Sequence, residues 1–331
     1  MFFKCLSFVY RVIITARNTA YNRGWLAARR APLPVISIGN ITAGGTGKTP
    51  LVIWLCNHFA RNGVVTAVLS RGYKGTDTDA DEPTLIRRDC PNTSVFINKD
   101  RYKGAIEAAK TIHNGVLILD DGFQHRRIKR DLNIITIDAT CPFGYDRMLP
   151  AGLLREPLTE IKRAKVAIVT RCDIVTEDQI NFVTWRLIRY NPSMLIVRAG
   201  HKYNGITMLD GSKLTMKALI GKKCFVFCGI GNPNAFLECL WNNNVSFTDY
   251  EIFEDHHNYG PADVNYILTK AKDCDIILTT EKDFVKLQDV TDPQFRKKCG
   301  CTEFEIEFYD NQQQLLSLIN KIPGKAMPSN N

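Results

Sequence analysis

The stretch NITAGGTGKTP, residues 40–50, decides the fold class of this chain. It follows a short apolar run, PVISI (34–38), and precedes a helical run, LVIWLCNHFARNG (51–63), that ends at a glycine. The general phosphate-loop pattern G-x-x-x-x-G-K-[ST] has glycine where Thr42 stands, but its other positions are matched. The alternative is a glycine-rich turn with a chance lysine, which the order of strand, loop and helix disfavours.

The loop has the parts that a phosphate site needs. Its glycines let backbone N–H groups approach phosphate oxygens, and the N-terminus of the following helix favours negative charge. Lys48 can reach the β- and γ-phosphates of a nucleotide, and the hydroxyl of Thr49 can ligate Mg²⁺. The predicted nucleotide-binding residues are Thr42, Ala43, Gly44, Gly45, Thr46, Gly47, Lys48 and Thr49.

A second apolar run, GVLILDDGFQH (115–125), contains two adjacent acidic residues. It predicts a central parallel strand over 116–119, with Asp120 and Asp121 at its carboxyl end. Ligands of open α/β sheets bind at this edge, and carboxylates there can hold Mg²⁺ directly or through water. The alternative is a turn with two solvated acids, which the upstream phosphate loop disfavours.

The remaining runs indicate the architecture. VVTAVLS, LNIITID and AKVAIVT alternate with helical stretches such as DRYKGAIEAAKTIHN. This repeat predicts an α/β fold of the P-loop NTPase type, a mostly parallel sheet with helices on both faces. In the second half, KKCFVFCGIGNP and DCDIILTTEKD each predict a further strand. They indicate a smaller C-terminal α/β domain.

The length of 331 residues favours more than one domain. We expect an N-terminal amphipathic helix within residues 1–30, a phosphate-loop domain over 31–200 and the smaller domain over 201–331. The smaller domain begins with a hairpin-like linker, for which Asn204-Gly205 and Asp210-Gly211 are turn signals.

The opening segment is both apolar and basic. Phe2, Leu6, Val9 and Ile13 recur at helical spacing, and Phe3, Tyr10 and Ile14 widen the stripe. Charged residues interrupt it too often for a membrane span. A core-packed helix and an interfacial helix, with its apolar face in the bilayer and basic residues at anionic headgroups, both fit. A signal peptide is disfavoured, because it would export the phosphate loop away from cytosolic nucleotide.

Net charge and cysteine content indicate which binding partners and which compartment fit this chain. The formal net charge of +9 indicates an anionic partner: nucleic acid, an anionic membrane surface or a phosphorylated substrate. The 11 cysteines lack paired CxxC spacing, which argues against a structural zinc site and fits a reducing compartment.

Eight motifs in a fixed order are more specific than these patterns. The set resembles the tetraacyldisaccharide 4′-kinase family, the lipid A 4′-kinases, from the amphipathic start to about Leu287. The motifs are ISIGNITAGGTGKTP (36–50), LSRGYKG (69–75), DEP (81–83), LDDGFQHRR (119–127), LPAGLLREP (149–157), FCGIGNP (227–233), FEDHHNY (253–259) and TTEKDFVKL (279–287).

The resemblance implies an activity and a location. Such enzymes transfer the γ-phosphate of ATP to the 4′-hydroxyl of tetraacyldisaccharide 1-phosphate, forming lipid IVA in lipid A biosynthesis. They work peripherally, as monotopic proteins, at the cytoplasmic face of the bacterial inner membrane. Extracting acyl chains costs about 0.8 kcal/mol per CH₂, so the enzyme must go to its glycolipid substrate. We expect ATP, Mg²⁺, the glycolipid and a membrane surface as partners, and no nucleic acid.

The resemblance also assigns residues. Lys48 and Thr49 match the phosphate and Mg²⁺ residues, and Asp120 and Asp121 match the Walker-B-type acids. Asp81 of DEP matches a catalytic base, although DEP could also be a turn that caps a helix. Gln124, His125, Arg155 and Glu156 fall in motifs expected to line the nucleotide and acceptor site. Arg71 is a further candidate for contacting phosphate.

A histidine of DHH matches the partner of that base. We prefer His256 over the adjacent His257, although DHH could also be a solvated surface loop. Because His256 falls in the second predicted domain, the resemblance implies two domains that face each other across a cleft and close.

One alternative function belongs to another class. The run TRCD (170–173) is similar to the T-K-x-D element with which GTPases read guanine, with Arg171 in place of lysine. A nucleotide-switch protein, such as a GTPase-type metallochaperone, would use the same loop and acids without forming a phosphorylated product.

Overall fold

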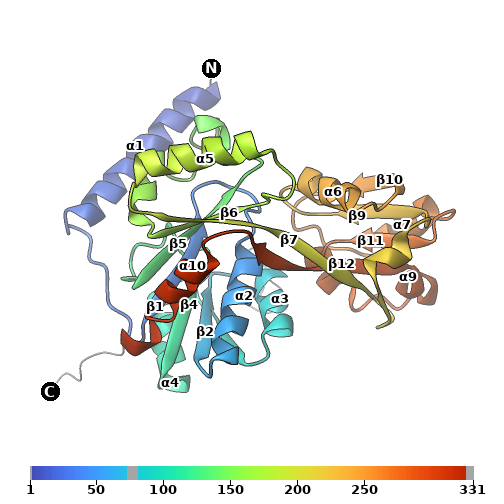
Figure 1. Cartoon of the computed structure of the whole chain (residues 1–331), viewed down its shortest axis with the longest axis horizontal. Helices are drawn as coiled ribbons and strands as arrows, with labels where there is room; N and C mark the ends of the chain where they lie inside the picture. The colour runs from blue at the N-terminus through green and yellow to red at the C-terminus, as the bar shows by residue number, and fades with distance from the viewer. Residues whose placement is uncertain (1, 73–80, 326–331) are drawn as a thin grey trace. The chain divides into compact units, whose positions relative to one another are not determined.

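A computed structural model describes residues 2–72 and 81–325, apart from the side chains of Phe2, Asp81 and Lys325. The chain forms two compact units (Figure 1), Met1–Gly200 with Glu307–Asn331 as unit 1 and His201–Ile306 as unit 2. We expected the smaller domain to run to the end of the chain. Strand β12 (Cys299–Phe308) instead leads back to unit 1, where Phe308 packs edge-on against Trp54.

Unit 1 contains a parallel sheet in the order β7-β6-β5-β1-β4-β2-β3. The strands are β1 (Val35–Asn40), β2 (Val65–Ser70), β3 (Thr93–Ile97), β4 (Gly115–Leu119), β5 (Leu132–Asp138), β6 (Val166–Thr170) and β7 (Leu195–Met208). All residues of β1, β4, β5 and β6 are buried, as expected for a parallel sheet covered on both faces. The predicted P-loop NTPase-type fold is therefore confirmed.

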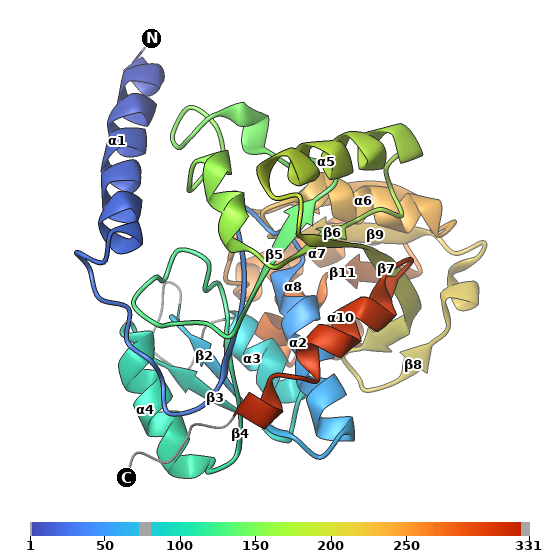
Figure 2. The same cartoon turned by 60° about the vertical axis from the view of Figure 1, so that its left-hand side comes forward.

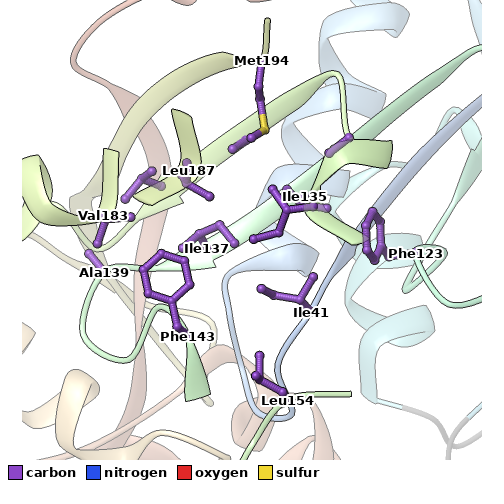
Figure 3. Close-up of a cluster of buried hydrophobic side chains, with 14 of the residues drawn as sticks. Ile41, Phe123, Ile135, Ile137, Ala139, Phe143, Leu154, Val183, Leu187 and Met194 are labelled. Atoms are coloured by element: carbon purple, nitrogen blue, oxygen red, sulfur yellow. The ribbon is translucent and has the colours of Figure 1, made fainter. Parts of the chain in front are cut away.

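Helices cover the two faces of this sheet. They are α2 (Lys48–Arg61), α3 (Asp81–Asp89), α4 (Arg101–Thr111), α5 (Glu177–Tyr190) and α10 (Gln312–Ile319). Register places Ile135 of β5, Ala167 of β6 and Leu117 of β4 on one face, which α4 and α5 cover. Figure 3 shows part of that core, where Ile135 and Ile137 lie near side chains of α5. Right-handed crossovers place α2 and α3 on the opposite face.

The N-terminal helix α1 (Phe2–Asn22) lies along the outside of unit 1 (Figure 2). Ile14 joins the core on the α5 face of the sheet, and Tyr10 packs against it. Most of the predicted apolar stripe points elsewhere: Phe3, Val9 and Ile13 are 61%, 53% and 58% exposed. The core-packed interpretation therefore holds for one narrow strip of the helix. Among the described residues, no helix is long and apolar enough to cross a membrane.

Unit 2 is a smaller α/β layer. Its sheet has the order β10-β9-β11-β12-β7, and β8 (Lys213–Leu214) pairs antiparallel with β7. The other elements are β9 (Cys224–Cys228), α6 (Pro233–Asn242), β10 (Phe247–Ile252), α7 (Pro261–Lys270), β11 (Ile276–Thr279), α8 (Glu281–Phe284) and α9 (Pro293–Lys298).

The hairpin predicted at the start of unit 2 is formed by β7 and β8. It has one of the two turns that the sequence predicted. Asp210-Gly211 forms the turn, in which Gly211 has φ 89° and Asp210 accepts a hydrogen bond from the Ser212 amide. The turn expected at Asn204-Gly205 is wrong, because both residues lie inside β7. A Cβ at Gly205 would lie 2.7 Å from the Leu214 carbonyl oxygen, so glycine here allows close strand approach.

Candidate active site

The phosphate loop connects β1 to α2 at the carboxyl edge of the unit 1 sheet. The Thr46 hydroxyl lies 2.7 Å from the Thr136 hydroxyl, and the Thr170 hydroxyl donates to the Thr46 carbonyl. On the other side, Thr42 forms an antiparallel bridge with Leu154. Thr42, at the position of the first glycine in the general pattern, therefore anchors the loop to the LPAGLLREP segment.

Two glycines of the loop adopt backbone conformations that favour glycine. Gly44 and Gly47 have φ values of 104° and 78°, in the region that favours glycine. A Cβ at Gly44 or Gly45 would meet no described atom within 4 Å, so the loop backbone is open on that side. This opening is where a phosphate could approach the amides.

Three predicted residues meet beside the loop. The ammonium of Lys48 lies 3.6 Å from a carboxylate oxygen of Asp121. Nη1 of Arg155 donates to both oxygens of the same carboxylate, at 3.1 and 2.9 Å. Although burial acts to raise the pKa of Asp121, the Lys48 and Arg155 cations hold it below its ordinary value. Asp121 is therefore an ionised anchor that positions two cations.

The adjacent acid has a different environment. Asp120, at 5% exposure, follows β4 directly. Burial, together with the Asp121 and Glu82 carboxylates, raises the pKa of Asp120 to about 6. The buried carboxylate of Asp120 and the buried hydroxyl of Thr49, near the start of α2, offer oxygen donors of the kind that Mg²⁺ prefers.

The structure adds Arg101, which sequence analysis missed. It is the first residue of α4 and only 6% exposed. Burial lowers its pKa, and the Asp121 and Asp120 carboxylates oppose that shift. Its Nε has no hydrogen-bond partner among the described residues. The available signal in the sequence was an arginine directly after the N-cap residue Asp100, at the start of the helix that follows strand β3.

The accessory residues have different positions. Gln124 donates a 2.8 Å hydrogen bond to the carbonyl of Asn40, at the end of β1. Burial, followed by the Arg101 and Arg130 cations, lowers the pKa of His125 to about 4, so its imidazole is neutral at pH 7. Arg71 is exposed and interacts electrostatically with Arg101.

Glu156 lies with α1. Its carboxylate is fully buried and binds Arg163, Arg17 at 2.9 Å and Asn18 at 3.4 Å. Burial raises its pKa, opposed by the two arginines. The neighbouring residue Arg155 points to Asp121, so the two adjacent residues connect the phosphate loop with α1.

Arg171 has a structural partner. It forms an ion pair with Asp138, the last residue of β5, and has φ 59°. The arginine of the TRCD run is therefore held in an ion pair at the carboxyl edge of the sheet.

In unit 2, three motifs hold the histidine loop. The His256 amide donates to the carbonyl of Gly229, whose own amide donates to the buried carboxylate of Asp283. Lys286 donates to the His257 carbonyl at 3.1 Å. The FCGIGNP, FEDHHNY and TTEKDFVKL segments are therefore one structural cluster.

The two histidines of that loop differ. The His257 ring stacks on Phe253, contacts Tyr259 and places Nε2 3.3 Å from Asp263. His256 has φ 64°, an uncommon conformation for a residue with a side chain, and its Nε2 is 3.9 Å from Asp255. These contacts favour a packing role for His257. Asp81 begins α3, and its side chain lies outside the described residues, so its partnership with His256 stays a prediction.

Comparisons with known proteins bear on this site. A family model described as tetraacyldisaccharide-1-P 4′-kinase matches residues 1–323. The tetraacyldisaccharide 4′-kinase of Geobacter sulfurreducens is 36% identical over 298 residues, which cover 84% of this chain and 82% of that protein. The enzyme of the same name from Chlorobium phaeovibrioides is 33% identical over 346 residues, covering 97% of each chain.

A solved structure agrees with these relatives. The crystal structure of LpxK from Aquifex aeolicus in complex with ATP superposes with a TM-score of 0.73 at 30% identity. The match covers 96% of this chain and 97% of that one. These similarities support the kinase and not the nucleotide-switch alternative. The chain belongs to the tetraacyldisaccharide 4′-kinase family.

Proposed function

We propose that the chain transfers the γ-phosphate of ATP to the 4′-hydroxyl of a tetraacyldisaccharide 1-phosphate. The arrangement of Lys48, Asp121 and Arg155 beside an open phosphate loop carries this proposal, within a chain that belongs to the kinase family. Phosphoryl transfer needs positioning and charge neutralisation more than covalent participation by the protein. Two cations held by one carboxylate meet that need.

Each residue of the site then has a task. Lys48 contacts the β- and γ-phosphates, while Arg155 and Arg101 neutralise charge on the transferred group. Thr49 and Asp120 would hold Mg²⁺, and Asp121 follows Asp120 directly in the chain. When bound, Mg²⁺ supplies charge neutralisation of the nucleotide phosphates. Asp121 orients Lys48 and Arg155, since it is within 3.6 Å of one and hydrogen-bonded to the other.

The acceptor hydroxyl must lose its proton. Asp81 takes this proton, and His256 orients and tunes the carboxylate. The backbone contacts that hold the His256 loop support this role, because a positioned group needs a rigid support. The packing of His257 against Phe253 and Tyr259 supports the choice of His256.

Peripheral membrane association completes the proposal. The exposed apolar residues of α1 are accompanied by exposed basic residues, among them Lys4, Arg11 and Arg23. This combination suits an interfacial helix on an anionic surface. We place the protein at the cytoplasmic face of a bacterial inner membrane, where its acylated substrate resides.

Transfer of radioactive label tests the activity. The purified chain is incubated with γ-³²P-ATP, Mg²⁺ and tetraacyldisaccharide 1-phosphate in detergent micelles, and the extracted lipid is analysed. Label in the lipid is expected, with its loss in Lys48→Ala. Release of inorganic phosphate without labelled lipid would instead support a nucleotide switch.

Vesicle flotation tests the membrane surface. Serine at Phe3, Phe8, Val12 and Ile13 removes exposed apolar area from α1. The matched control has serine at four exposed positions of unit 2, Ile220, Trp241, Tyr250 and Ile252. The α1 variant alone should leave the vesicle fraction while keeping wild-type circular dichroism. Equal flotation of both variants would show that the apolar residues of α1 do not bind the membrane.

A further inference from the structure

A pocket lies in unit 1, apart from the phosphate loop. It has a volume of about 360 Å³ and borders the C-terminal end of α1 through Tyr21. Lys129, Arg130 and Asn133 surround the start of β5, whereas Thr46 of the phosphate loop contacts Thr136 near the other end of that strand. The proposed kinase mechanism leaves this pocket without a task.

The lining of the pocket is strongly basic. Five of its nine residues are cationic: Arg30, Arg126, Lys129, Arg130 and Arg163. No acidic residue is found among the described residues that line it. Guanidinium groups match phosphate oxygens with paired N–H donors, so four arginines and a lysine form a suitable surface for a phosphate group.

The nearby carboxylates neutralise only part of this charge. Arg163 binds Glu156 and Glu160, Arg126 lies 3.8 Å from Glu160, and Arg30 lies 3.4 Å from Asp131. In the described part of the chain, neither Lys129 nor Arg130 has a carboxylate within ion-pair distance. Arg130 donates instead to the carbonyls of Gly122 and His125, at 2.7 and 2.6 Å.

Like charges consequently repel one another in the pocket. Burial, followed by the Arg163 and Arg126 cations, lowers the pKa of Arg130 to about 9. Burial and Arg163 likewise lower the pKa of Arg126. A bound anion would offset this repulsion, because it supplies the negative charge that the neighbouring acids do not provide.

The pocket is also built onto the N-terminal helix. Arg126 donates to the carbonyl of Asn18 at 3.0 Å and to the side chain of Asn22 at 2.7 Å. Its guanidinium lies over the ring of Tyr21, 5.0 Å from the centroid. An anion in the pocket would therefore lie where the exposed, apolar and basic helix ends.

We propose that this basic pocket binds the phosphate group of a membrane lipid. Two lipids share this chemistry: the glycolipid substrate, which carries a 1-phosphate, and an anionic phospholipid. The first source rests on the proposed function, whereas the second requires only a membrane surface. Phosphate at this site fastens the end of α1 to the lipid surface.

Charge reversal at the rim of the pocket gives the test variant. Arg30 and Lys129 are exposed, so Arg30→Glu/Lys129→Glu alters the pocket with little effect on packing. Arg61→Glu/Lys110→Glu is the matched control, with the same charge change at exposed positions of α2 and α4. Lys129→Glu alone serves if the double variant unfolds, since Lys129 has no carboxylate partner in the described residues.

The first arm measures kinetics in neutral detergent micelles, with substrate that carries or lacks the 1-phosphate. If the substrate occupies the pocket, the pocket variant should raise KM about tenfold or more for the phosphorylated substrate at similar kcat. The preference for the 1-phosphate should then disappear. The control should keep both the KM and the preference of the wild type.

The second arm measures flotation with phosphatidylcholine vesicles with or without phosphatidylglycerol. If a phospholipid headgroup occupies the pocket, the pocket variant should lose more phosphatidylglycerol-dependent binding than the control. The third arm measures the rise of Tm with inorganic phosphate. A rise abolished only in the pocket variant, with no difference in the other two arms, would overturn the lipid assignment in favour of an adventitious anion.

Identical behaviour of pocket and control variants in all arms would overturn the site altogether. Failure of the proposed kinase function has a different signature, since the wild type would then label no lipid in the first arm. The vesicle and phosphate arms would still test the pocket.

Discussion

Arg17 of α1 places Nη2 2.9 Å from the fully buried carboxylate of Glu156. Glu156→Ala leaves Arg163 and Arg17 without this partner, and we expect a loss of about 3–5 kcal/mol in the free energy of unfolding. Arg17→Ala should cost less, because Arg163 still pairs with Glu156. Urea unfolding measures both, with exposed Glu107→Ala as the control. Hydrogen exchange of α1 amides should rise in both Glu156 and Arg17 variants; unchanged exchange would show that this contact does not hold the helix.

Lys48→Ala should lower kcat on the order of 10²-fold or more, because it removes a cation from the β/γ-phosphate position. The Asp121 carboxylate keeps Arg155 as a partner, so the fold should persist. Initial rates of lipid phosphorylation measure the effect. Lys110→Ala, at an exposed position on α4, is the matched control and should retain wild-type rates. Near-normal turnover of Lys48→Ala would exclude the loop from the reaction.

Asp120→Ala and Asp121→Ala should both weaken the dependence of activity on Mg²⁺, and chelation by EDTA should abolish transfer in the wild type. Asp120 supplies a buried oxygen donor, while Asp121 also holds Lys48 and Arg155 in place. Rates across a Mg²⁺ titration give the activity, and electron paramagnetic resonance of Mn²⁺ with ATP gives metal binding. Wild-type Mn²⁺ affinity in both variants would contradict the metal assignment.

Asp81→Ala should lower kcat strongly while largely sparing ATP affinity, since deprotonation of the acceptor follows nucleotide binding. His256→Ala should show a similar or milder loss, and the double variant should be far from additive if the pair acts as one unit. His257→Ala should be the milder of the two histidine changes. The readouts are kcat and ATP affinity for all four variants. Multiplicative losses would argue against a dyad, and a dominant effect at His257 would move the assignment by one residue.

His125 predicts a defined pH dependence of stability. Its pKa is lowered from 6.5 to about 4 in the folded chain, so between these values the unfolded state binds a proton that the folded state does not. Its contribution to stability is therefore present above pH 6.5 and is lost as pH falls toward 4. Between pH 7 and pH 4.5, the free energy of unfolding should fall more for the wild type than for His125→Gln. An unchanged difference, or an imidazole that titrates near 6.5 by NMR, would contradict the assignment.

Sequence by itself determined the local elements and the family. The alternation of apolar runs and helical stretches predicted the parallel sheet, because buried strands and amphipathic helices have different hydrophobic periods. The phosphate loop was readable because glycine, lysine and threonine have tasks set by their own chemistry and by the adjacent strand and helix. Asp120 and Asp121 followed from the same logic, since residues at the carboxyl end of a parallel strand lie at the ligand edge.

Only the tertiary structure decided which distant side chains meet. The helical pattern of α1 fits both a core and a membrane surface, and only the placed helix shows that Phe3, Phe8 and Ile13 are exposed whereas Ile14 is buried. Glu156 matched the site motifs, yet its carboxylate binds Arg17, 139 residues away in the chain. The basic pocket likewise combines residues from α1, the segment before β5 and η2 (Leu158–Arg163). Such contacts depend on long-range packing and burial, which local periodicity and spacing do not encode.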